Sequence, residues 1–174
     1  ISDAFEVKFV DYESNNKVPQ TSPQARLYSD DDSKNFRIGG KGILLSPLRG
    51  GPFWLAVSGR LGRNLSEHNS KQGYAFGEIT GTWQFNSKLA FSVNPKVAWS
   101  GAGNLYGLGL GANFAISQKL ELLPEIIIAG DNFSKTTSTL GLRYRFNDSI
   151  STTVYASTAA SLNNIGQLLG KGDA

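Results

Sequence analysis

The sequence predicts an all-β fold whose strands form an antiparallel, up-and-down sheet. The main observation is a two-residue alternation of apolar and polar residues over residues 73–146, clearest in residues 88–99. In addition, 20 glycines among short apolar runs indicate a chain with many turns. No apolar run approaches the ~18 residues of a membrane-spanning helix. We expect a single β-domain over residues 1–161, followed by a Gly- and Asn-rich loop or tail over residues 162–174.

About ten segments show the alternation of a strand with one apolar face. They are residues 4–12, 24–29, 35–45, 53–62, 73–85, 88–99, 106–116, 120–128, 139–146 and 150–156. We expect each strand to pair with the next along the chain. Pro95 and Pro124 fall inside two of these strands, where each removes a ladder hydrogen bond, so we expect β-bulges there.

Little in the sequence indicates catalysis or metal binding. There is no cysteine, and the one histidine, His68, lies in a polar loop beside Glu67. Catalytic partners must converge from different segments, so neighbours in one loop rarely form a triad. The acidic run at residues 30–32 lacks the ligand spacing of an EF-hand and is expected to be a turn. A net charge of +3 is too mild to indicate nucleic-acid binding. We expect no enzymatic activity, no cofactor and no metal.

A sheet of this length must close into a barrel, since open edges would aggregate. A soluble lipocalin-like carrier would turn the apolar face inward, whereas a membrane barrel would turn it outward to lipid. Strands of about 12 residues match a tilted membrane-spanning strand. The shortest turns, at residues 86–87, 117–118 and 147–148, fall at one end, and most longer loops fall at the other. Loops 15–23 and 46–52 are expected at the short-turn end and weaken this rule.

Aromatic residues of the apolar face lie near both ends of the strands, with aliphatic residues between them. This distribution is typical of the interfacial girdles of a membrane barrel. The expected membrane-interface aromatics are Trp83, Phe85, Trp99, Tyr106, Phe114, Tyr144 and Phe146. We therefore expect a transmembrane β-barrel with its polar face inside.

The alternating hairpins of residues 73–156 resemble bacterial outer-membrane β-barrel proteins in general. The resemblance implies an outer membrane of a Gram-negative-type envelope, or of an organelle of such origin. It implies the lipid bilayer as partner and leaves other envelope proteins and the oligomeric state open. Such proteins usually end on a strand with a terminal aromatic residue and keep both chain ends at the short-turn side. Ten strands would place both ends at the long-loop side, and one missing strand at each end would give twelve.

The inward face carries most of the charged residues of the expected barrel. The proposed lumen-lining residues are Lys8, Arg26, Arg37, Lys41, Arg60, Glu78, Lys88, Lys96, Lys119, Glu121, Glu125, Arg143 and Arg145. The cations outnumber the acids, so one function is a pore that passes small anionic or polar solutes. Alternatively, paired charges fill the lumen and the barrel has a structural or anchoring role. A soluble carrier of an apolar ligand and an outer-membrane lipid-modifying enzyme are the remaining alternatives.

Overall fold

The computed structural model describes residues 5–14, 33–64, 73–101, 103–131, 134–147, 150–159 and 167–168. For residues 5–14, 33–35 and 64 it describes the backbone alone. The strands are β1 (Phe5–Ser14), β2 (Ser33–Leu45), β3 (Trp54–Asn64), β4 (Gly73–Asn86), β5 (Leu89–Ser100), β6 (Gly103–Ala115), β7 (Leu120–Ala129), β8 (Thr137–Arg145) and β9 (Ser151–Ser157). One short 3-10 helix, η2 (Pro47–Arg49), lies between β2 and β3.

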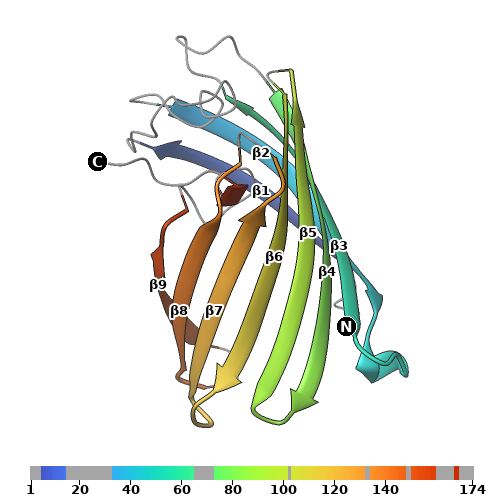
Figure 1. Ribbon diagram of the computed structural model, residues 1–174, viewed down its shortest axis with the longest axis vertical. Helices are drawn as coiled ribbons and strands as arrows, with labels where there is room; N and C mark the ends of the chain where they lie inside the picture. Colours follow the sequence, from blue (N-terminus) through green and yellow to red (C-terminus); the bar gives the residue numbers. More distant parts are fainter. Residues whose placement is uncertain are drawn as a thin grey trace.

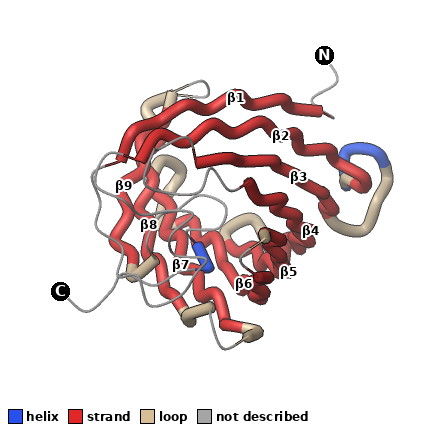
Figure 2. The backbone as a smooth tube through the Cα atoms, turned by 90° about the horizontal axis from the view of Figure 1, so that it is seen from above, coloured by secondary structure: helices blue, strands red, loops and turns tan. Residues whose placement is uncertain are grey.

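The described residues form one antiparallel sheet of nine strands in the order of the sequence, so the predicted all-β, up-and-down arrangement is confirmed (Figure 1). Long hairpins follow directly from the alternation, because each strand pairs with the next over most of its length. The sheet curls round a concave face (Figure 2). It is not closed, since no pairing in the described part of the chain joins β9 to β1.

The expected strand at residues 24–29 does not lie between the first two strands of the sheet. β1 and β2 pair with each other over their whole facing length, from Phe5 with Gly42 to Ser14 with Ser33. This pairing leaves no room for another strand between them, and residues 24–29 themselves lie outside the described residues. The expected succession of ten paired strands is therefore wrong at this point.

Because β1 pairs directly with β2, the two ends of the sheet are assigned differently from the prediction. The connections at residues 46–53, 87–88, 116–119 and 146–150 lie at one end, here called the short-turn end. The strand ends that flank the β1–β2, β3–β4, β5–β6 and β7–β8 connections lie at the other end, the long-loop end. β1 therefore begins at the short-turn end and β9 finishes at the long-loop end. The prediction places the start of the first strand and the end of the last strand together at the long-loop end.

The two prolines interrupt the ladder without the expected bulges. Between β4 and β5, the pairs stop at Glu78 with Lys96 and resume at Gly81 with Val93 in the same register, passing over Pro95. The ladder of β6 and β7 passes over Pro124 in the same way. Register shifts occur elsewhere, between Ile43 and Leu45 and between Gln84 and Asn86. Proline lacks the backbone N–H donor, so pairing is lost locally, but no extra residue is inserted to form a β-bulge.

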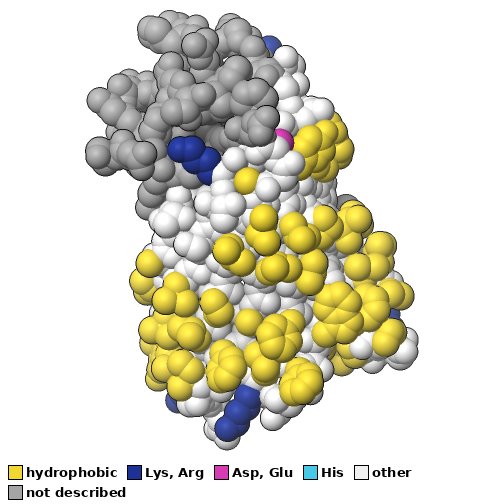
Figure 3. Space-filling view, viewed as in Figure 1, with side chains coloured by type: hydrophobic (Ala, Val, Ile, Leu, Met, Phe, Trp, Pro, Cys, Tyr) yellow, Lys and Arg dark blue, Asp and Glu magenta, His cyan; other side chains and the backbone are white. Residues whose placement is uncertain are grey.

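The apolar face of the sheet points outward to the surroundings, and the polar face points into the concave interior. Large apolar side chains are exposed along every strand from β2 to β9, and they form a band over the outer surface (Figure 3). By contrast, Arg37, Ser58, Lys96 and Thr137 are buried. This distribution inverts the usual arrangement of a water-soluble protein, in which large apolar groups fill the interior and paired charges stay outside.

Candidate functional site

The interior holds an ion cluster, here called the ion triad, made of the buried Lys96 and the partly exposed Glu78 and Glu125. Glu78 on β4 and Lys96 on β5 are direct cross-strand partners, and Glu125 comes from β7. Lys96 Nζ lies 3.3 Å from Glu78 Oε2 and 3.4 Å from Glu125 Oε1. Lys96 is only 4% exposed, so its charge depends on these carboxylates for compensation.

Two amide side chains complete the surroundings of Lys96. The Asn94 amide fits with its oxygen 3.3 Å from Lys96 Nζ and its nitrogen donating to the Gly109 carbonyl at 2.8 Å. Lys96 Nζ also donates to the side-chain oxygen of Gln167. Gln167 is held in turn by Thr137, whose hydroxyl donates to the Gln167 carbonyl at 2.9 Å. The ammonium group is thus surrounded by oxygen acceptors from four segments of the chain.

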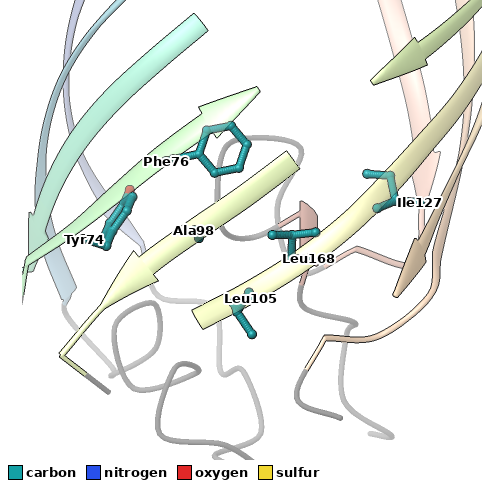
Figure 4. Close-up of a cluster of buried hydrophobic side chains, with 6 residues drawn as sticks. All are labelled: Tyr74, Phe76, Ala98, Leu105, Ile127 and Leu168. Atoms are coloured by element: carbon teal, nitrogen blue, oxygen red, sulfur yellow. The ribbon is translucent and has the colours of Figure 1, made fainter. Parts of the chain in front are cut away.

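An apolar cluster lies in the interior toward the long-loop end of the ion triad. It consists of Tyr74, Phe76, Ala98, Leu105, Ile127 and Leu168 (Figure 4). Phe76 and Leu105 are each direct cross-strand partners of Ala98. Leu168 is fully buried against the inner side of β6, and its carbonyl accepts from the Lys135 N–H at 3.0 Å. The apolar cluster and the ion triad thus lie at neighbouring levels of the interior.

A cavity of about 330 Å³ lies on the other side of the ion triad, toward the short-turn end. Its polar lining includes Thr82, Ser92, Asn113, Glu125, Thr139 and Tyr155. Glu125 belongs to the ion triad as well, so the charge cluster forms one boundary of the cavity. The space is large enough for several water molecules, and its hydroxyl and amide groups can bind them.

A second ion cluster, here called the arginine cluster, lies below this cavity at the short-turn end. Glu121 on β7 is the direct cross-strand partner of Arg143 on β8. Its carboxylate lies 3.2 Å from Arg143 Nη1 and 2.8 Å from Arg145 Nη2. Asn113 donates to the same carboxylate at 3.5 Å. Two guanidinium groups therefore share one carboxylate, and the cluster keeps an excess positive charge.

The structure brings six of the proposed lumen-lining residues together in these two clusters. Arg37 is buried, and Arg60 lies with its guanidinium carbon 6.0 Å from the ring centre of Phe76. Lys41, Lys88 and Lys119 are exposed and take no part in either cluster. The side chain of Lys8 and all of Arg26 lie outside the described residues, as does His68.

All seven aromatic residues predicted at the interfaces point outward from the sheet. Trp83, Phe85, Trp99, Tyr106, Phe114, Tyr144 and Phe146 are each exposed, Phe85 by 76%. Trp83 packs against Phe53 with ring centres 5.0 Å apart, and Tyr144 makes an edge contact with Phe146 at the same distance. The first contact joins β4 to the β2–β3 connection, and the second lies at the end of β8.

The sequence prediction missed the apolar cluster, because it treated the inward face as uniformly polar. The signal that could have found it is the register. Phe76, Ala98 and Leu105 all interrupt the polar set of their strands, and the pairing places them in one row. Gln167 and Leu168 carry no such signal, since they belong to the part of the chain predicted as a loop or tail.

Within the described residues, no helix has the length and apolar character needed to cross a membrane. The same part of the chain contains no group of three or more His, Asp or Glu side chains that could hold a metal ion.

Comparisons with known proteins give no match: no protein-family model, no curated protein and no solved structure is similar to this chain.

Proposed function

We propose that this chain forms the wall of a transmembrane β-barrel in an outer membrane, with a structural or anchoring role and an interior filled by its own side chains. The observation that carries this proposal is the exposed apolar outer face. Burial of an apolar side chain away from water is worth about 1.5–3 kcal/mol for Val, Leu, Ile or Phe. Exposing a continuous band of such side chains to water would be costly, whereas contact with lipid removes this penalty.

The ends of this band support the same proposal. Aromatic side chains lie near the short-turn end at Phe85, Phe114 and Phe146, and near the long-loop end at Trp99 and Tyr106. Between them the outer face carries mainly aliphatic residues, such as Leu108, Leu110, Ile126 and Ile128. Rings at both ends with aliphatic groups between them match the profile of a bilayer. A soluble carrier would need the opposite orientation of the sheet.

The direction of the edge strands limits how such a barrel can close. β1 and β9 both run from the short-turn end to the long-loop end, because an even number of antiparallel steps separates them. They cannot pair with each other in an antiparallel ladder. Closure as an up-and-down barrel therefore needs an odd number of further strands between them, which agrees with the even strand numbers of bacterial barrels.

The interior favours the structural role over an open passage. The apolar cluster and the ion triad occupy neighbouring levels of the concave face. An open, water-filled pore would instead expose polar groups along its whole length.

A pair of arginine substitutions on the outer face tests the membrane assignment. Leu110 lies at the middle of β6, and Ile116 follows the end of β6 at the short-turn end; both are exposed. In a bilayer, L110R should lower the free energy of unfolding by about 2–4 kcal/mol, and I116R by about 0–1 kcal/mol. The measurement is urea unfolding in lipid vesicles, monitored by heat-modifiable migration on a gel. Equal tolerance of both substitutions, or a folded state that forms without detergent or lipid, would contradict the proposal.

A further inference from the structure

The short-turn end of the sheet carries three exposed cations, here called the cation rim: Arg49, Lys88 and Lys119. Arg49 lies in η2, Lys88 precedes β5 and Lys119 precedes β7. None of the three forms an ion pair within the described part of the chain. Lys and Arg side chains are visible at this end, directly below the apolar band (Figure 3). These cations are free to bind an external anion.

The described residues of this end carry more cations than carboxylates. The arginine cluster adds two cations and one carboxylate to the cation rim. Among the described residues, five cations and one carboxylate thus lie at the short-turn end.

Apolar and aromatic side chains lie next to the cation rim on the outer face. Phe85 precedes the turn that holds Lys88, and Phe114 and Ile116 precede Lys119; all three are exposed. Rings of this kind sit at the level of lipid headgroups. Cations three to five residues farther along the chain would then lie among the headgroup phosphates, where Lys and Arg bind anionic oxygens well.

From this arrangement we propose that the short-turn end binds the headgroups of anionic phospholipids. The inference rests on the proposed membrane function and specifies the lipid that this side of the protein contacts. An anionic headgroup such as phosphatidylglycerol offers uncompensated negative charge. The headgroup of phosphatidylcholine contains a choline cation, which repels the cations of the protein. Each cation near an anionic surface should enrich anionic lipid roughly fivefold.

Tryptophan quenching by brominated lipids tests this proposal. Trp83 points outward near the short-turn end of β4, and Trp99 points outward near the long-loop end of β5. One protein retains Trp83 alone, with W54F and W99F, and a second retains Trp99 alone, with W54F and W83F. Each is reconstituted in mixed vesicles in which either the phosphatidylglycerol or the phosphatidylcholine carries bromine on its acyl chains.

We expect brominated phosphatidylglycerol to quench Trp83 several-fold more strongly than brominated phosphatidylcholine at equal mole fraction, and Trp99 to show no such preference. The preference should fall in 1 M salt, where the screening length is about 3 Å. It should disappear in the triple variant R49Q/K88Q/K119Q, which changes only exposed side chains. K135Q, an exposed change at the long-loop end, is the matched control and should retain it.

The possible results separate this inference from the proposed function. Equal quenching of Trp83 by the two lipids overturns the headgroup proposal while leaving the membrane assignment intact. A preference that survives in R49Q/K88Q/K119Q, or that Trp99 shares, also overturns it. Absence of quenching by either lipid overturns the proposed function itself, because the outer face would then not contact lipid.

Discussion

Lys96 is the residue on which the organisation of the interior depends most directly. Its ammonium group is almost completely removed from solvent and lies between the carboxylates of Glu78 and Glu125. Removing a charge from water costs several kcal/mol, and only close opposite charges and hydrogen bonds offset this cost. The ion triad contains two carboxylates and one cation. Lys96 is therefore the only cation in the triad that compensates the two carboxylates, whereas Lys96 keeps one carboxylate if the other is removed.

We therefore expect K96M to lower the free energy of unfolding by about 3–5 kcal/mol, because it preserves volume but leaves two carboxylates facing each other. Lys41 is the matched control: it lies in the same row of the sheet, two strands from Glu78, but is exposed. K41Q should change stability by less than about 0.5 kcal/mol. Urea unfolding in vesicles measures both.

A triple variant separates charge from packing at the same site. K96M/E78Q/E125Q removes all three charges with little change in volume, so it should recover most of the stability lost in K96M. If the triple variant stayed as unstable as K96M, the loss would come from packing, and the electrostatic account of the ion triad would be wrong.

At the scale of the strands, two neighbouring glycines on β2 and β3 have opposite surroundings. A Cβ added at Gly39 would lie 2.7 Å from the carbonyl oxygen of Gly59, a backbone atom that cannot move without disturbing the ladder. A Cβ added at Gly59 would meet nothing within 4 Å. Gly39 thus permits the close approach of β2 and β3, whereas Gly59 only leaves space on the outer face.

Alanine substitution should distinguish the two glycines. We expect G39A to destabilise the protein by about 1–3 kcal/mol through overpacking. G59A should be neutral or stabilise it by up to about 1 kcal/mol, since it restricts the unfolded chain without a clash. The midpoints of urea unfolding in vesicles test this pair; equal midpoints would show that β2 and β3 can separate locally to accept a methyl group.

Sequence alone predicted the later strands well and the start of the sheet poorly. From β4 to β9 each strand follows the last through a connection of a few residues or one with clear turn chemistry, so alternation and turns fix the pairing locally. Residues 24–29 also alternate, through Ala25 and Leu27, yet β1 pairs directly with β2. Alternation shows that a segment has two faces, but it does not show which segment is its neighbour.

The interior could be predicted only where charged residues share a row of the sheet. Glu78 and Lys96 are cross-strand partners, as are Glu121 and Arg143, and their strand parity already placed them inside. Gln167 contacts Lys96 across 71 residues of sequence. Such a contact depends on how far the sheet curls, which is a property of the assembled sheet and leaves no periodic signal in the chain.

At the scale of the whole molecule, the fold separates an apolar outside from a charged and layered inside. In the proposed membrane the outer band would contact lipid, while the ion triad and the apolar cluster connect the strands on the inside of the sheet. Leu168 links the two clusters, since it is fully buried within the apolar cluster and adjoins Gln167, which binds Lys96. If the interior is blocked to solutes, the ion triad and the apolar cluster are the groups that block it.

Conductance across a planar lipid bilayer tests whether solutes pass through the interior. We expect the protein to show no steady conductance, because the side chains of these two clusters block it. The variant Q167G/L168G should admit ion flow, since it removes both the acceptor on Lys96 and the leucine of the apolar cluster. L48A changes a side chain that is 91% exposed at the short-turn end and should remain closed. Steady, anion-selective conductance of the unaltered protein that R143S/R145S abolishes would instead establish a cation-lined pore, and the structural role would have to be given up.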